Sequence, residues 1–352
     1  MKYLIQLFIF IILVFISFYI FILSVDPYDK YNFNYWELKT KAVNSYRDNK
    51  FNQIDNSQIK YDLFIIGSSR VQGFNPSLIE LETGLKTFNY GVNNSKPEDL
   101  LAITRHIIAK QKPKIIFLQV DFYHLNKSIP IDRRLKTSPL GKYLNENIKA
   151  SSSNSIFYLY NQSYLTLRSL RDSIKIIYKN KLGKIETTHN KNGMKIEHKI
   201  PKKAKLAKAY FQNEYKNYEF GKQRIQDFIQ LKELCKKNDI NLIVSISPMN
   251  KEHFLTLMKN KKLFNMLLMF KRKIVEIFIE VYDFNNLGAF QYNYPYWIDS
   301  VHPSMELSNI MSEIIFDRKK EESNIFGKKI TNDNINQYLQ DLNISSQKLF
   351  SN

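Results

Sequence analysis

The longest hydrophobic run of this chain lies at its N-terminus. Residues 3–25, YLIQLFIFIILVFISFYIFILSV, contain no charged side chain. A helix of about 20 apolar residues spans the hydrocarbon core of a bilayer, whereas a cleavable signal peptide has a shorter apolar region and a small-residue cleavage site. The pattern therefore predicts an uncleaved transmembrane helix over residues 1–25, followed by a juxtamembrane connector with one short helix over residues 26–59.

The charges beside this run indicate its orientation. Lys2 and the terminal amine precede it, and Asp26 and Asp29 follow it, with Lys30 close behind. Positive charge favours the cytoplasmic side, so we expect a single-pass protein with a cytoplasmic N-terminus and a periplasmic or cell-surface C-terminal domain. The alternative is a buried helix of a soluble protein, which the length and purity of the run disfavour.

From residue 60 onward, short apolar runs alternate with amphipathic stretches. The apolar runs predict strands at residues 60–69, 86–91, 113–122, 240–248 and 281–284. The amphipathic stretches predict helices at residues 75–84, 96–111, 218–238 and 263–280, and residues 299–319 predict a turn that leads into a last helix. Near-continuous apolar strands separated by helices are typical of a parallel sheet that is covered on both faces. We therefore predict an α/β domain over residues 60–319, a three-layer sandwich with a mostly parallel sheet of about five strands.

Two segments depart from this alternation. Residues 127–206 contain a helical stretch and then a polar, lysine-rich stretch, and we interpret them as an insertion. A mobile lid, an electrostatic platform and a solvated loop are all compatible with this composition, and the solvated loop is the default. Residues 320–352 are polar and rich in Asn and Ser, which predicts a partly ordered C-terminal tail.

The formal net charge of +19 raises the question of an anionic partner. Lys, Asn, Ile, Phe and Tyr are all abundant, as an AT-rich genome would give, and the lysines are spread along the chain. A general excess of lysine explains the charge better than a dedicated anion groove. We therefore expect no nucleic-acid partner.

Cysteine and histidine bound the chemistry further. Cys235 is the single cysteine, so no disulfide forms within the chain and no cysteine-based metal site is possible. The six histidines include no His-x-x-x-His pair, which disfavours a zinc enzyme. We expect no metal site.

The predicted topology selects one edge of the sheet. Ligands of open α/β sheets gather at the carboxyl ends of the strands. The segments that follow the predicted strands or join this edge are residues 67–70, 91–95, 121–126, 247–253 and 299–302. Candidate chemistry is therefore sought among these residues.

A serine, a histidine and a carboxylate belong to this edge. A serine nucleophile needs a base, and the base needs an orienting carboxylate. Asp299 and His302 stand three residues apart in DSVH, and Ser69 follows the first strand, so the three are candidate catalytic residues. The alternatives are that Ser69 or Asp299 only caps a helix and that His302 is an ordinary surface histidine.

Other polar groups at this edge have possible supporting roles. An oxyanion needs donors, and the candidates are the backbone N–H groups of Ser69 and Gly91 and the side-chain amides of Asn93 and Asn94. Candidates for a substrate cleft are Arg70, Asp121, Asn126 and His253. As alternatives, Arg70 pairs with a local carboxylate, and His253 is an exposed histidine of a helix. The same two interpretations apply to His124.

These residues resemble the motifs of the SGNH/GDSL hydrolase superfamily. Gly67-Ser68-Ser69 resembles its Gly-Asp-Ser block, Gly91 its second block, and Asp299-x-x-His302 its last block. The stretches IIGSSRVQGFNPSLIE, FNYGVNNSKPEDLLAITRHII and PKIIFLQVDFYHLN look like the membrane-anchored cell-envelope branch. That branch includes proteins similar to the D-alanyl-lipoteichoic acid transfer protein and to alginate and peptidoglycan O-acetyltransferases. The resemblance covers roughly residues 60–126 and 240–318, plus the N-terminal helix.

Two positions depart from the superfamily pattern. Ser68 stands where Asp is usual, and VDFYHLN replaces the third block, Gly-x-Asn-Asp. The asparagine that this block contributes to the oxyanion site therefore has no direct counterpart, although Asp121 or Asn126 lies in its place.

The resemblance implies a serine esterase or O-acyltransferase that acts on a cell-envelope polysaccharide or related polymer and needs no cofactor. Its expected partners are the membrane, through residues 3–25, an acylated glycan or polymer, and a membrane-bound acyl-donor protein. Two alternatives stand beside it. One is a catalytically degenerate domain that binds glycan or a partner protein, and the other is electrostatic binding of an anionic polymer by residues 184–208.

Overall fold

The computed structural model describes most of the chain in two compact units. The described residues are 1–28, 35–38, 46–132, 134–135, 138–144, 166–183, 192–195, 208–286, 296–316 and 326–351. The N-terminal unit comprises residues 1–57 and 145–188, and the sheet unit comprises residues 58–144 and 189–352.

The N-terminal unit begins with α1 (Lys2–Val25), which is long and apolar enough to cross a membrane. Large apolar side chains along most of its length are exposed, so α1 is not the core helix of this unit. The helix ends at Asp26, which has a φ of 42° and donates its N–H to the carbonyl of Ile22. Pro27 follows and cannot continue an α-helical hydrogen-bond ladder. The unit also contains α2 (Tyr46–Asp55) and α7 (Leu167–Lys181).

The sheet unit contains a six-stranded sheet in the order β2-β1-β3-β4-β5-β6. Its strands are β1 (Leu63–Ile66), β2 (Thr87–Asn89), β3 (Ile115–Val120), β4 (Asn241–Ile246), β5 (Glu280–Asp283) and β6 (Lys328–Thr331). The first five strands are parallel, and β6 pairs antiparallel with β5. The prediction of an α/β domain with a mostly parallel sheet is confirmed.

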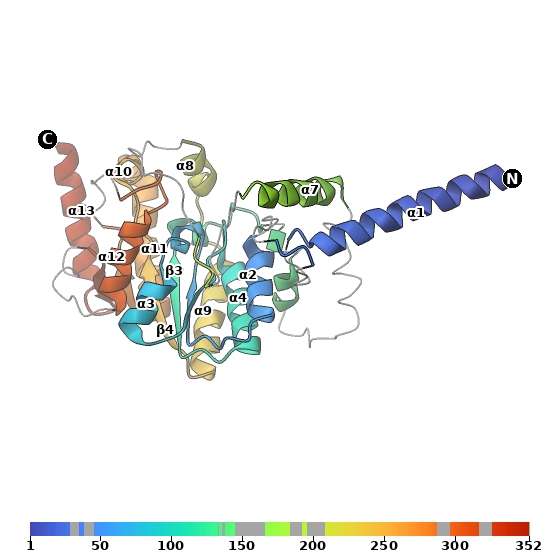
Figure 1. Cartoon of the computed structure of the whole chain (residues 1–352). Coiled ribbons are helices and arrows are strands. Elements are labelled where there is room, and N and C mark those ends of the chain that lie inside the picture. Colours follow the sequence, from blue (N-terminus) through green and yellow to red (C-terminus); the bar gives the residue numbers. More distant parts are fainter. Residues whose placement is uncertain are drawn as a thin grey trace. The chain divides into compact units, whose positions relative to one another are not determined.

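Helices separate the parallel strands, as the alternation predicted. They are α3 (Pro76–Thr83), α4 (Pro97–Lys110), α9 (Lys222–Lys237), α10 (Lys251–Lys259), α11 (Lys261–Phe278) and α12 (Met305–Phe316). α3 packs beside α12, and α4 packs beside α9 (Figure 1). Local sequence sets the bounds of α3: the Asn75 side chain accepts a hydrogen bond from the N–H of Ser77, Pro76 opens the helix, and Gly84 ends it with a φ of 71°.

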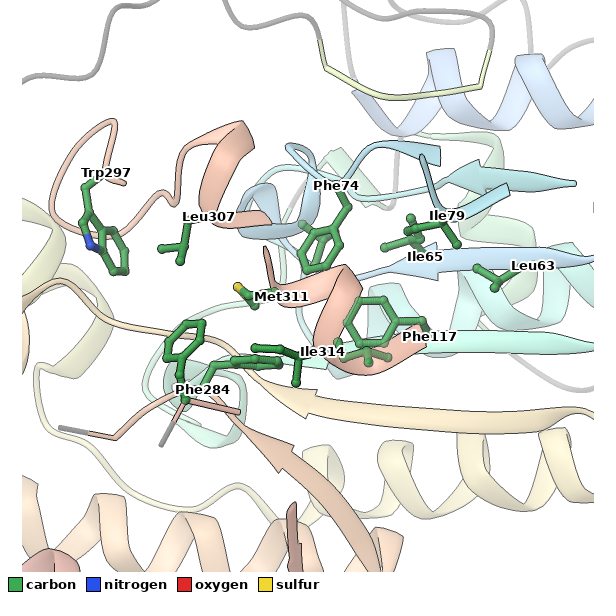
Figure 2. Close-up of a cluster of buried hydrophobic side chains, with 13 residues drawn as sticks. Leu63, Ile65, Phe74, Ile79, Phe117, Phe284, Trp297, Leu307, Met311 and Ile314 are labelled. Carbon is green, nitrogen blue, oxygen red and sulfur yellow. The ribbon is translucent and has the colours of Figure 1, made fainter. Parts of the chain in front are cut away.

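The main core cluster lies between the sheet and the pair formed by α3 and α12. Leu63, Ile65 and Phe117 of β1 and β3 point into it, and Leu307 and Met311 of α12 meet them there (Figure 2). The residues that alternate with these along the same strands are also fully buried: Phe64, Ile66, Ile116 and Leu118. Both faces of β1 and β3 are therefore covered, which explains why these strands are apolar throughout.

The C-terminal segment was predicted to be a polar tail, and this prediction is wrong. It contributes β6 to the sheet and then forms α13 (Ile335–Ser351). A fully buried contact ties it to the core: Lys271 of α11 pairs with Asp283 of β5, and the Tyr338 hydroxyl of α13 donates to the same carboxylate over 2.7 Å. The antiparallel β6 makes the sheet one strand wider than the five that were predicted.

The segment predicted as an insertion lies only partly within the described residues. Two backbone hydrogen bonds join it to the sheet unit, from the N–H of Asn89 to the carbonyl of Asn192 and from the N–H of Lys195 to the carbonyl of Gln72. At these points the segment is a structural part of the unit and not a solvated loop. Most of the basic stretch 184–208, and with it the hypothesis of a polymer-binding platform, lies outside the described residues.

The buried Lys271–Asp283 pair generates a stability prediction. Replacing Lys271 with Met leaves the Asp283 carboxylate buried without its cation, which should lower the free energy of unfolding by about 3–5 kcal/mol. Lys273→Met is the matched control, because Lys273 of the same helix makes an ion pair with Glu276 that is exposed to solvent, and its loss should cost at most about 0.5 kcal/mol. Denaturant unfolding of both variants measures the difference, and equal costs would contradict the prediction.

Candidate active site

The direction of chain progression reverses at β1, and this positions the candidate site. β2 lies on one side of β1 and β3 on the other, so the connections leaving the carboxyl ends of β1 and β3 diverge there. Such a switch point is where ligands bind in open α/β sheets. Ser69 lies three residues beyond the end of β1, and Asp121 directly follows β3.

A tight turn presents Ser69. Close packing explains Gly67, because a Cβ there would lie 2.7 Å from the Cγ1 of Val71. The Ser68 hydroxyl accepts a hydrogen bond from the N–H of Arg70 and so caps the short 3₁₀ helix η1 (Ser69–Val71). Ser68 therefore takes the capping role that was the alternative for Ser69. Within the described part of the chain, the Ser69 N–H donates no hydrogen bond, as is usual at the start of a helix.

A pinned loop presents Asp299 and His302. The N–H of Ile298 donates to the carbonyl of His302 over 3.0 Å, and the N–H of Ser304 donates to the carbonyl of Tyr296 over 2.8 Å. The Ser304 hydroxyl accepts from the N–H of Leu307 at the start of α12. Asp299 is therefore not the cap of that helix, which was its alternative role.

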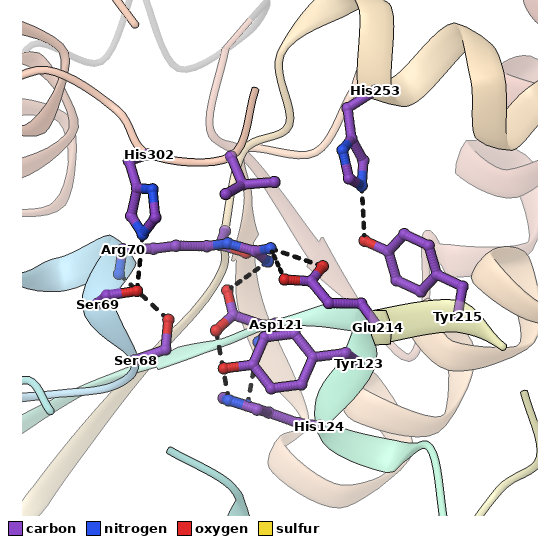
Figure 3. A network of polar contacts seen from close by, with 12 residues as sticks. Ser68, Ser69, Arg70, Asp121, Tyr123, His124, Glu214, Tyr215, His253 and His302 are labelled. Carbon is purple, nitrogen blue, oxygen red and sulfur yellow. Dashed lines mark hydrogen bonds and ion pairs between the residues drawn. The ribbon is translucent and has the colours of Figure 1, made fainter. Parts of the chain in front are cut away.

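The two segments meet in one chain of hydrogen bonds. Ser69 Oγ lies 2.8 Å from His302 Nε2 (Figure 3), and His302 Nδ1 lies 2.9 and 2.8 Å from the two carboxylate oxygens of Asp299. An ionised carboxylate can only accept, so Nδ1 carries the ring proton and donates it to Asp299. Nε2 of the neutral ring is then the acceptor for the Ser69 hydroxyl. All three side chains are only partly buried.

The surroundings of Asp299 keep it ionised. Its partial burial alone would raise its pKa, but the hydrogen bond and charge of His302 and the backbone N–H groups of Val301 and His302 hold the pKa well below the ordinary range. Asp299 therefore remains a carboxylate that can orient and stabilise a charged His302 ring.

The loop after β2 lies against the Ser69 turn. The N–H of Val92 donates to the carbonyl of Gly67 over 3.1 Å, and a Cβ on Gly91 would lie 3.2 Å from the carbonyl oxygen of Ser68. The Gly91 N–H, however, donates to Asn89 Oδ1 over 2.9 Å. Of the backbone donors predicted for an oxyanion, Gly91 is therefore engaged and Ser69 is available.

The two asparagines of this loop differ. Asn94 is exposed, and its side-chain amide donates to Asp132 over 3.4 Å. Asn93 directly follows the residue that is bonded to Gly67, is half-buried, and makes no hydrogen bond within the described residues. Asn93 is therefore the side-chain candidate that the geometry leaves available.

Arg70 lies in a buried ionic cluster beside the turn that carries Ser69. Its guanidinium donates to Asp121 over 3.0 Å and to both carboxylate oxygens of Glu214 over 2.8 Å, and it lies over the ring of Tyr123 (Figure 3). Arg70 is 2% exposed and Asp121 is fully buried. The prediction that these two residues line an accessible substrate cleft is therefore wrong, and the alternative of a carboxylate partner for Arg70 is the one observed.

The charged groups of this cluster shift one another's pKa values. Burial alone would lower the pKa of Arg70, yet Glu214 and Asp121 raise it well above its ordinary value. Burial would raise the pKa of Asp121, but Arg70 and His124 bring it below its ordinary value. Burial raises the pKa of Glu214, and Asp121 adds to this effect. One cation thus faces two carboxylates, of which Asp121 is the better stabilised.

Asn126 is also a structural residue and not part of a cleft. Its amide donates to the carbonyl of Glu214, and its Oδ1 accepts from the N–H groups of Ser128 and Glu219. It is fully buried and joins the segment after β3 to the segment that follows α8 (Lys208–Tyr215). Sequence reasoning missed Glu214 altogether, because a partner 144 residues from Arg70 leaves no local signal.

Two further histidines at this edge are buried. His253 of α10 is fully buried with Nε2 3.1 Å from the Tyr215 hydroxyl, so it is neither exposed nor open to a cleft. Burial, assisted by Arg70 and opposed by Asp299, lowers the pKa of His253 to about 3. Burial lowers the pKa of His124 to about 4 against the pull of Asp121. Both rings are therefore neutral near neutral pH.

Among the described residues, no group of His, Cys, Asp and Glu is arranged to hold a metal ion.

Comparison with known proteins adds no assignment. No protein-family model matches the chain, and no curated protein sequence matches it.

The buried histidines generate a pH prediction. Below about pH 6.5 a histidine of the unfolded chain gains a proton, whereas folded His253 stays neutral down to about pH 3. The unfolded state then binds more protons, so stability is lost as the pH falls. We expect His253→Gln to reduce the loss of unfolding free energy between about pH 7 and about pH 4.5 by about 2–3 kcal/mol.

Tyr215→Phe is the matched control, because it removes the same hydrogen bond and keeps the histidine. Its unfolding free energy should fall with pH as steeply as that of the wild type, as measured by denaturant titration at each pH. An unchanged pH dependence in His253→Gln would show that the ring is not held neutral by the fold.

Proposed function

We propose that this protein is a membrane-anchored, extracytoplasmic serine esterase or O-acyltransferase that acts on a cell-envelope polysaccharide or a related polymer. The observation that carries the proposal is the hydrogen-bond chain from Ser69 through His302 to Asp299 at the carboxyl ends of parallel strands. The order of the parallel strands agrees with a three-layer, SGNH-like domain, which is part of the same proposal.

The reaction would proceed through an acyl-enzyme. The Ser69 oxygen attacks the acyl carbonyl while His302 Nε2 takes the hydroxyl proton, and Asp299 stabilises the resulting imidazolium. The tetrahedral intermediate collapses, His302 returns the proton to the leaving alcohol, and the acyl group remains on Ser69. Water or a sugar hydroxyl then attacks this ester with His302 as base, which completes hydrolysis or transfer and restores the Ser69 hydroxyl.

The oxyanion would be held by two donors near Ser69. The Ser69 N–H has no acceptor within the described residues and belongs to the first turn of η1. The Asn93 amide would supply the second donor, in the absence of the asparagine that the superfamily's third block contributes. We assign no such role to Gly91, whose N–H is bonded to Asn89.

The membrane location rests on α1. Its length, its apolar composition and its exposed side chains suit a span, and Lys2 before it favours a cytoplasmic N-terminus. An envelope polymer and a membrane-bound acyl donor are the partners that such a location would offer.

Covalent labelling tests the nucleophile. A fluorophosphonate probe should label the full-length protein in detergent on Ser69, and Ser69→Ala should abolish labelling. Asp299→Asn should slow labelling, and turnover of p-nitrophenyl acetate or of acetylated glycans, by about 10³–10⁴-fold, because the wrong tautomer of His302 then faces Ser69. Labelling rates by gel and the modified peptide by mass spectrometry provide the measurements.

Ser68→Ala is the matched control for Ser69→Ala. It removes the hydroxyl that caps η1 and that also faces Asp121 and Tyr123 and leaves Ser69, His302 and Asp299 in place, so the variant should lose about 1 kcal/mol of stability and keep its labelling. If wild type and Ser69→Ala are equally inert toward probe and esters, the enzyme proposal fails, and the remaining candidate is a catalytically degenerate domain that binds glycan or a partner protein.

The oxyanion assignment makes a separate prediction. Asn93→Ala should lower kcat by about 10²–10³-fold with little change in KM, since the lost hydrogen bond is made mainly in the transition state. Asn94→Ala is the neighbouring control and should retain activity near that of the wild type, because Asn94 is exposed and bonded to Asp132. Equal kcat values for the two variants would rule out the role of Asn93.

A further inference from the structure

The helix α7 carries an exposed apolar stripe. Leu167, Ile174, Tyr178 and Leu182, at its two ends and between them, are 82%, 53%, 62% and 49% exposed. At 3.6 residues per turn these positions fall on one side of the helix. The opposite side is the buried one, since Ile176 is 3% exposed. The stripe is therefore an apolar surface, interrupted by Arg171, that the described part of the chain does not cover.

Positive charge borders this stripe. The helix and its last turn carry five cationic side chains and a single acid, Asp172: Arg168, Arg171, Lys175, Lys179 and Lys181. Arg168 and Arg171, which are 59% and 72% exposed, both pair with Asp172, so the single acid leaves an excess of positive charge. An apolar stripe flanked by cations is the pattern of a helix that lies in the headgroup region of an anionic bilayer.

Contacts with α1 fix where this helix would meet the bilayer. Leu170 packs against a cluster at the end of α1 that includes Phe18, Phe21 and Ile22. The Tyr28 hydroxyl, just beyond α1, donates to Asp172 over 3.0 Å. At 1.5 Å per residue, Ile22 lies about 5 Å before the end of a helix about 36 Å long, which is near one boundary of a hydrocarbon core about 30 Å thick. The first turns of α7 therefore meet α1 at this boundary.

Aromatic side chains lie at the same level of α1. The indole N–H of Trp36 donates to the Ser24 hydroxyl over 3.0 Å, and Trp36 stacks edge-on with Tyr35. These rings are 44% and 81% exposed. Tyr and Trp are enriched at membrane–water interfaces, so this feature marks the same boundary independently of α7.

We propose that α7 is an interfacial helix that inserts its apolar stripe into the outer headgroup region, with its cations on anionic lipid phosphates. The inference rests on the membrane anchoring by α1 that forms part of the proposed function. A lone transmembrane helix leaves its extramembrane part free to rotate and tilt, whereas a second contact beside it restricts both. Continuity with α1 and the excess of positive charge favour an anionic lipid surface over a protein as the occupant of the stripe.

Depth-dependent fluorescence quenching tests this proposal in the full-length protein, reconstituted in nanodiscs with or without anionic lipid. A polarity-sensitive fluorophore is attached to Leu167→Cys and, separately, Ile174→Cys. The native Cys235 should not react with the fluorophore, because it is buried and its pKa is raised to about 12. Wild-type protein treated with the same fluorophore therefore serves as the blank. Both probes should emit at shorter wavelength than in water and be quenched more by nitroxide lipids labelled near the headgroup than by those labelled deep in the acyl chain. The effect should weaken without anionic lipid.

Two further labelled positions keep the outcomes distinct. Val14→Cys in α1 should be quenched most by the deep nitroxide, and Glu233→Cys, exposed on α9, should not be quenched. If the Val14 probe is unquenched, the anchoring by α1 fails. If that probe is quenched but both α7 probes behave like Glu233, the interfacial helix is refuted. A short-wavelength emission without quenching means that protein covers the stripe, and this also overturns the proposal.

Discussion

The candidate site depends on the ion pairs that the buried guanidinium of Arg70 makes with two carboxylates. Arg70 follows Ser69 directly in sequence and bonds to Asp121 at the end of β3 and to Glu214 of α8. Three segments that are distant in sequence thus share one cation. A buried charge without partners is strongly destabilising, so none of the three can shift without leaving a charge unpaired. The ion pairs of Arg70 therefore hold the turn that carries Ser69 in place.

The fold was largely predictable because its central strands are buried on both faces. Continuous apolar runs such as LFII at residues 63–66 are typical of a parallel strand that is covered on both faces. The edge of the sheet was not predictable. β6 (Lys328–Thr331) has exposed or half-buried residues around a single buried Ile330, which gives no apolar run. The long-range contact of Tyr338 with Asp283 holds β6 and α13 against the rest of the unit. No local sequence pattern predicts that contact.

The residues of the candidate site were likewise predictable only where local sequence patterns contain them. Ser69, Asp299 and His302 could be found because one glycine-bounded strand end and one four-residue motif contain them, and the rule for strand ends brings the two together. The roles of Asn126 and His253 could not be found. Both are polar residues at the same strand ends, and only their distant partners, Glu214 and Tyr215, reveal that their hydrogen bonds are already used.

Burial distinguishes the three histidines at this edge. His124 and His253 are fully enclosed, and their lowered pKa values keep them neutral and unprotonated through ordinary conditions. His302 is 24% exposed and bonds to a carboxylate on one nitrogen and to a hydroxyl on the other. Its ring is therefore accessible to solvent while it contacts both Ser69 and Asp299. The buried ion pairs of Arg70 and the partly exposed hydrogen-bond chain of Ser69 thus begin at consecutive residues of one turn, so the turn joins a buried charged cluster to a solvent-accessible edge of the sheet.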